Sequence, residues 1–174
     1  FGVNTKEMGR NLSVMMKSPG VFGTSTREMI KTSIAAHKLG VSIDALKGPM
    51  GVFDDFESGA KAAAELASEF GILVDSQSLM SAEPAEQALM LKDALAASGQ
   101  EYANLSRQEK ARISELTGIN TNDLNALMDP NNAFNLDAFG DVENEVDAAT
   151  QATMDQAAAT QQLVKQMEKL NKIY

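Results

Sequence analysis

The feature that most limits how this chain can fold is a succession of helix start and stop signals between residues 53 and 128. Ser106 and Glu109 stand three residues apart, the spacing of a capping box in which each side chain accepts a hydrogen bond from the other residue's backbone N–H. This pair predicts a helix that begins directly after the serine, and Gly118 ends it because glycine tolerates a left-handed backbone. Thr121 offers the next N-cap. The sequence therefore predicts two short helices joined by a tight turn.

Similar signals recur along the chain. Asp54 or Asp55 begins an acidic, alanine-rich helix that Gly71 ends, and Pro84 begins another. Further predicted boundaries are a capping box of Ser25 with Glu28, a helix end at Gly40, an N-cap at Ser42, a bend at Gly48-Pro49-Met50-Gly51 and a stop at Pro130. We expect an all-α fold: an elongated array of short helices followed by a long C-terminal helix that forms a coiled coil.

Composition divides the 174 residues into four expected segments. Residues 1–52 are mildly basic short helices with a Gly/Pro hinge, and residues 53–130 are an acidic helical region that ends in the helix-turn-helix-like pair. Residues 131–140 are predicted to form a polar linker. Residues 141–174 lack Gly and Pro and are predicted to form one helix. Because the chain begins at Phe1, we expect it to be part of a longer protein.

The C-terminal segment carries a heptad pattern with apolar ends and a polar middle of Thr153, Gln156 and Thr160. Its apolar members, the expected contacts between copies, are Val142, Val146, Ala149, Leu163, Met167 and Leu170. A polar middle suits a multi-chain coiled coil better than a helix lying on an apolar core. The alternative is an amphipathic helix packed on its own domain.

Charge and residue types argue against catalysis, a metal site and a cofactor. The net charge is −9, with ten acidic residues against two lysines in residues 53–105, so the chain as a whole should repel nucleic acid phosphates. Cysteine is absent, and the single histidine, His37, has no ligand residues at metal-binding spacing. A calcium loop after Asp129 fails because its twelfth position is Gly140 rather than Glu. No apolar run is long enough to span a membrane.

Several sequence motifs, taken in their order along the chain, resemble those of the tail tape measure proteins of bacteriophages. In that family an "aromatic, Glu, Ser" phrase opens an acidic Ala/Leu helix, matched here by Phe56-Glu57-Ser58. A later helix with an "Asn/Ser-Arg-x-Gln/Glu" start, matched by Leu105 to Glu109, leads into a second helix, matched by Ile119 to Leu124. The similarity covers residues 24–130, and the Gly/Pro bend departs from it.

This resemblance implies a structural protein without enzymatic activity. Family members occupy the lumen or tip of the tail tube in the virion, set tail length during assembly in the host cytoplasm, and leave ahead of the DNA at ejection. The implied partners are further copies of the chain, as a trimer or hexamer, together with the tail tube protein and the baseplate or tail-tip hub proteins.

An alternative interpretation is a DNA-binding or assembly-factor protein that uses residues 106–128 as a helix-turn-helix. The second helix of such a unit should present basic or amide side chains to bases. Here it offers Asn120, Asn122, Asn125 and Asp123 and no Lys or Arg, so stable sequence-specific binding of nucleic acid is not expected.

Overall fold

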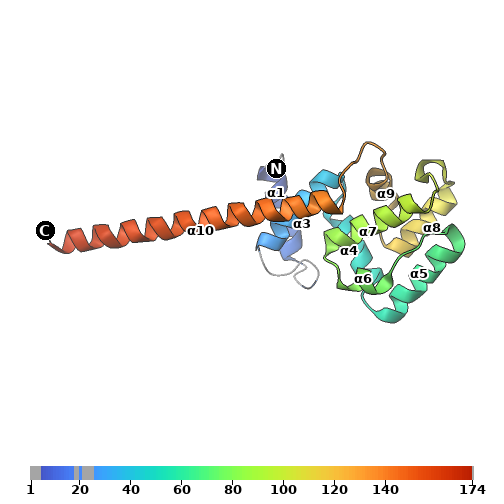
Figure 1. The fold of residues 1–174 in the computed structure, drawn as a ribbon, viewed down its shortest axis with the longest axis horizontal. Helices are drawn as coiled ribbons and strands as arrows, with labels where there is room; N and C mark the ends of the chain where they lie inside the picture. The colour runs from blue at the N-terminus through green and yellow to red at the C-terminus, as the bar shows by residue number, and fades with distance from the viewer. Residues whose placement is uncertain (1–4, 18–19, 21–25, 174) are drawn as a thin grey trace.

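The computed structural model describes residues 5–17, 20 and 26–173, and every regular element within them is helical. The elements are α1 (Thr5–Met16), α3 (Thr26–Leu39), α4 (Ile43–Val52), α5 (Phe56–Phe70), α6 (Ser76–Ser81), α7 (Pro84–Ala97), the 3-10 helix η1 (Tyr102–Asn104), α8 (Arg107–Thr117), α9 (Thr121–Leu127) and α10 (Leu136–Ile173). Figure 1 shows the short helices gathered at one end, with α10 projecting from them. The all-α class predicted from the sequence is confirmed.

Most of the predicted caps form as expected. The Asp55 side chain accepts from the N–H of Ser58 and begins α5, which Gly71 ends in the left-handed conformation at φ 67°. Ser106 and Glu109 form the capping box of α8, and Gly118 ends that helix at φ 75°. These caps satisfy backbone groups that helix ends leave without partners. The Ser25 half of the other predicted box lies outside the described residues.

Two local predictions are wrong. The Gly/Pro sequence does not end the helix, because α4 continues through Pro49 to Val52. Pro49 is buried, and packing outweighs the loss of its N–H in this ten-residue helix. The N-cap of α9 is Asn120 rather than Thr121: the Asn120 side chain accepts from the N–H of Asp123 at 2.9 Å.

The short helices do not form an extended array but share one hydrophobic core. The buried residues of this core run from Met15 in α1 to Val146 in α10 and include Leu46, Leu66, and Leu89 from the middle helices. Since α4 packs on α7 and α8, the expected boundary between residues 52 and 53 falls inside this core. We call the described residues up to 147 the body.

A glycine pair lets α4 approach the turn between α8 and α9. A Cβ placed on Gly48 would lie 1.8 Å from the carbonyl oxygen of Gly118, and one on Gly118 would lie 2.3 Å from the carbonyl oxygen of Gly48. Backbone therefore meets backbone here, which only two residues without side chains permit. Nearby, Arg112 of α8 binds Glu65 and Glu69 of α5 at 2.9 and 2.8 Å.

The last helix begins earlier than the sequence suggested. The Asn135 side chain accepts from the N–H of Ala138 at 2.9 Å, so α10 begins at Leu136 and Gly140 lies within it. The expected linker of residues 131–140 is correspondingly shorter. The helix has 38 residues, which at about 1.5 Å per residue corresponds to a length of about 57 Å.

Candidate assembly surface on the C-terminal helix

The first turns of α10 are anchored on α3 by apolar side chains. Phe139, Val142 and Val146 recur at heptad spacing and are 2, 5 and 2% exposed. Together they cover α3, whose Ile34 and Ala35 are fully buried. At about 25 cal/mol per Å² of apolar surface, burial of three such side chains stabilises the contact by several kcal/mol. This part of α10 therefore belongs to the core of the body.

A buried lysine stabilises the same contact between α3 and α10. The Lys31 ammonium of α3 lies 2.5 Å from the Glu143 carboxylate of α10 and 3.4 Å from that of Glu83, before α7, and its side chain is only 3% exposed. It also lies 5.9 Å from the centre of the Phe139 ring. Burial alone would lower the pKa of Lys31, but the hydrogen bond to Glu143 and the attraction of both carboxylates outweigh it and raise that pKa. Lys31 thus stays charged and joins three elements.

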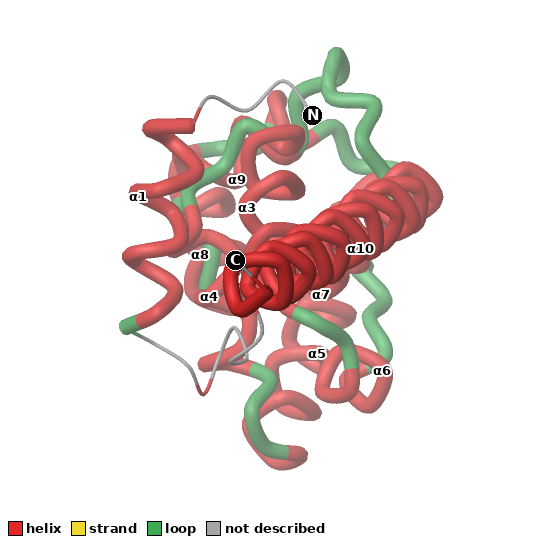
Figure 2. The backbone as a smooth tube through the Cα atoms, turned by 90° about the vertical axis from the view of Figure 1, so that its left-hand side faces the viewer, coloured by secondary structure: helices red, strands yellow, loops and turns green. Residues whose placement is uncertain are grey.

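Beyond the body, the described side chains of α10 are exposed to solvent. The ion pair of Arg27 with Asp147 lies where α3 begins, and every side chain from 158 to 170 is exposed. Four of them are large and apolar and lie on one side of the helix: Leu163, Val164, Met167 and Leu170, at 60, 50, 68 and 57% exposure. We call these four residues the exposed stripe. Figure 2, which looks toward the free end of α10, shows that end lying well in front of the other helices.

The predicted contact residues therefore divide into two groups. Val142 and Val146 are covered by their own chain, so the expectation that they contact another copy is replaced by an intramolecular role. Leu163, Met167 and Leu170 are exposed, and the side chain of Ala149 lies outside the described residues. The sequence placed Phe139 in the expected linker, packed against a neighbour, rather than on this helix, and it did not indicate Lys31. Extending the heptad frame back by three residues would have found Phe139, whereas no local signal marks Lys31.

The helix pair α8 and α9 uses its polar groups to hold the fold together. The Asp123 carboxylate accepts from the backbone N–H and the hydroxyl of Ser42 at 3.0 and 2.8 Å, which ties α9 to the start of α4. The Asn120 side chain is occupied as a cap. Of the polar residues expected to face bases, only Asn122 and Asn125 remain exposed without such a role in the described contacts.

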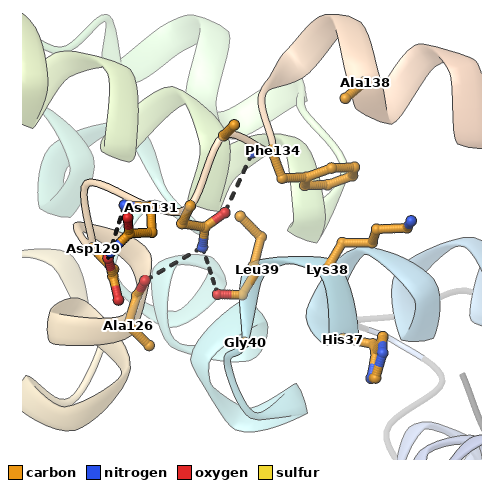
Figure 3. A pocket seen from close by; sticks show the side chains of 11 residues that line it. His37, Lys38, Leu39, Gly40, Ala126, Asp129, Asn131, Phe134 and Ala138 are labelled. Carbon is orange, nitrogen blue, oxygen red and sulfur yellow. Dashed lines mark hydrogen bonds between the residues drawn. The ribbon is translucent and has the colours of Figure 1, made fainter. Parts of the chain in front are cut away.

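A groove of about 560 Å³ separates the end of α3 from the segment that leads into α10. The Asn132 amide donates to the carbonyls of Leu39 and Ala126 at 2.7 and 3.3 Å. Figure 3 shows Leu39 and Ala126 in this groove. Asp129 accepts from the N–H of Asn131 at 2.8 Å, a turn rather than a calcium loop. Within the described residues, no three His, Cys, Asp or Glu side chains are grouped so that they could hold a metal ion.

A second hollow of about 370 Å³ lies between the segment after α5 and the end of α7. It is mostly apolar, with Leu79 and Met90 in its wall, Leu73 at 78% exposure on its edge and Asp75 and Asp93 beside them. Asp75 caps α6, since its carboxylate accepts from the N–H of Gln77. Among the described lining residues, the titratable side chains are the carboxylates of Asp75 and Asp93.

Comparison with known proteins identifies no relative: no protein-family model, curated protein or solved structure matches this chain. Among the described helices, none combines the length and the apolar character needed to cross a lipid bilayer. The exposed stripe on α10 is thus the surface that best qualifies as a functional site.

Proposed function

We propose that the chain is part of a bacteriophage tail tape measure protein and acts as a structural scaffold without catalysis. The observation that carries the proposal is the combination of a small helical body with a long helix whose far end exposes an unpaired apolar stripe. An exposed row of large apolar side chains is typical of a protein interaction site. The order of the sequence motifs in residues 24–130 supports the assignment to the tape measure family.

The physical properties of the chain suit a ruler inside a tube. A helix adds a fixed length of about 1.5 Å per residue, so α10, unlike the short helices that share one core, converts chain length into distance. The net charge of −9 disfavours adhesion to DNA that must pass through the same channel. Both properties agree with a protein that lies in the tail lumen or tip and leaves ahead of the genome.

The proposed partners follow from this location. Copies of the chain associate through the far part of α10 as a coiled coil, in three or six copies that match the rotational symmetry of a tail tube. The tube protein and the hub proteins of the tail tip or baseplate surround them. Assembly takes place in the host cytoplasm, and the final location is the virion.

A DNA-binding function has less support. A recognition helix needs side chains that donate to base edges or phosphates, and α9 carries neither Lys nor Arg. Its Asp123 is held by Ser42 and adds negative charge where DNA would approach.

Quantitative mass spectrometry of purified tail particles tests the proposal. The amount of this chain is measured against the major tube protein, with a known minor tail protein as the internal standard. A few copies per tail, in a number that matches the symmetry of the tube, are expected. Absence from intact particles that have assembled normally would overturn the proposal and leave an assembly factor as the better interpretation.

A further inference from the structure

The second hollow receives apolar side chains from four separate segments of the body. Leu73 follows α5, Leu79 belongs to α6, Met90 to α7, and Leu136 is the first residue of α10. Leu73 is 78% exposed and Leu136 37%. Single exposed leucines are common, but these two meet at a hollow of about 370 Å³. An apolar hollow with exposed apolar side chains on its edge is typical of a surface that a partner covers.

One wall of the second hollow is a side of α7 that does not enter the core. Successive side chains of an α-helix are about 100° apart, so Ala97 and Ala94 lie at about −20° and 40° from Met90. Asp93 lies at about −60° on the same scale, whereas Leu95, which is buried in the core, lies at about 140°. The two alanines are small, and they leave room on this side of α7 for side chains of another molecule.

The charged groups that line the second hollow have one sign. Its titratable members are the carboxylates of Asp75 and Asp93, and both residues are exposed. Lys92 precedes Asp93 in the sequence, but its ammonium donates to the backbone carbonyl of Asn132 at 2.7 Å. The surrounding region is acidic as well, with ten acidic residues against two lysines in residues 53–105. A basic partner is therefore attracted both at the hollow and from a distance.

The walls of the second hollow also restrict the form of the partner. Within the described residues no strand offers an edge that a partner could extend. Proline-rich segments dock on aromatic side chains and phosphorylated segments on arginines, and neither residue type is among the described lining residues. The recognition mode that fits is an amphipathic helix that lays its apolar side into a hydrophobic groove.

The exposed stripe of another copy does not meet these requirements. Lys165 and Lys169 lie at about 200° and 240° from Leu163, on the side of α10 opposite to the stripe. A stripe placed in the second hollow would hold these lysines away from Asp75 and Asp93. The fitting helix instead carries its basic side chains next to its apolar ones.

We propose that the second hollow, with Leu73 and Leu136 on its edge and Asp75 and Asp93 in its lining, is the docking site for a basic amphipathic helix of another protein. Such a helix places large apolar side chains against Met90, and a Lys or Arg of the adjacent turn pairs with the carboxylates. The proposal depends neither on the tail assignment nor on association through α10.

Methionine methyl NMR of the whole chain, titrated with two synthetic helical peptides, tests the site. Both peptides carry leucines on one side, flanked by lysines in the first peptide and by glutamates in the second. The lysine peptide should shift the signal of Met90, which Met90→Leu identifies, and leave those of the exposed Met16 and Met167 in place. It should bind at least about tenfold more tightly than the glutamate peptide. An unshifted Met90 signal or equal affinities for the two peptides would overturn the proposal.

Two pairs of substitutions assign the binding to the second hollow. Leu73→Ser should weaken binding of the lysine peptide at least about tenfold, whereas Phe56→Ser, which removes an apolar side chain that is 67% exposed outside the lining, should change it by less than about twofold. Asp93→Lys should abolish the preference for the lysine peptide, and Glu145→Lys, the same charge change at an exposed position of α10, should preserve it. All four positions are exposed, so the fold should be retained. Equal effects within either pair would contradict the assignment.

A second copy as the occupant would give a different result. Sedimentation equilibrium of the chain without peptide should yield the same mass for Leu73→Ser as for the unmodified chain. A lower mass for Leu73→Ser would show that another copy fills the second hollow, and the assignment to a separate protein would be overturned. This outcome is independent of the count in tail particles, which tests the proposed function.

Discussion

The closest backbone contact in the body provides the sharpest test of the packing. In Gly48→Ala, the new Cβ would lie 1.8 Å from the carbonyl oxygen of Gly118, whereas ordinary contacts begin at 3.4 Å. Helix α4 must therefore move away from the turn after α8 by about 1.6 Å, the difference between these distances. Because both sides of the contact are backbone, no side chain can yield. Overpacking of this kind costs about 1–3 kcal/mol and occasionally more, and we expect the upper end.

Gly51 supplies a matched control on the same helix. A Cβ at Gly51 meets no atom within 4 Å, so Gly51→Ala should gain the helix propensity of alanine, about 0.5–1 kcal/mol. Gly48→Ala gains the same propensity, and its net loss should therefore be about 2 kcal/mol. The two variants should differ by about 3 kcal/mol.

Urea unfolding followed by circular dichroism measures this difference. The midpoint of Gly48→Ala should fall and that of Gly51→Ala should rise, with the slope unchanged for both. If the two variants unfold at the same urea concentration, the close approach of α4 to the α8–α9 turn is not present in solution. A separate refutation would be a Gly48→Ala variant as stable as the unmodified chain.

Three further predictions concern polar contacts. Ser106→Ala should lower the free energy of unfolding by about 1 kcal/mol in urea titrations, because it removes half of the capping box of α8. Glu143→Ala should destabilise the chain by about 1–3 kcal/mol, since it removes the nearer of the two carboxylates from a buried ammonium and leaves Glu83 at 3.4 Å. Lys31→Met should cost less, because Glu143 is partly exposed and can be hydrated. Equal losses in thermal melts would contradict this asymmetry. The hydroxyl and the N–H of Ser78 hold the pKa of Asp75 below its ordinary value, so its contribution to stability is present above about pH 4, the ordinary pKa of Asp, and disappears as the pH falls through the lowered pKa. Asp75→Asn should therefore lose less stability than the unmodified chain on acidification below about pH 4, and parallel pH curves for the two would refute this.

The local boundaries of the fold could be predicted because they depend on residues close together in the sequence. Ser106 and Glu109 are three residues apart, and their capping box forms whatever the rest of the chain does. Gly71 and Gly118 end helices because their own backbone freedom permits φ values near 70°. The all-α class follows from the succession of such signals. The N-cap of α9 was predicted at Thr121 instead of Asn120 because both residue types cap helices well.

The candidate assembly surface could be predicted only in part. The heptad pattern marks an apolar stretch at each end of α10 with a polar middle between them, but it contains no information on which end is covered by the chain itself. That depends on α3, more than a hundred residues earlier, and on Lys31, whose partner Glu143 is 112 residues away. Similarly, Pro49 lies within a helix because buried packing compensates for its missing N–H.

By itself, the sequence determined the helical class, most of the helix ends and the apolar side of the C-terminal helix, because capping and helical periodicity are short-range effects. Only the tertiary structure decided that the short helices share one core, that Gly48 meets Gly118, and that Val142 and Val146 are buried while Leu163 and Met167 are exposed. These features depend on which distant segments lie side by side, and pairs of residues far apart in the chain leave no periodic signal in a single sequence.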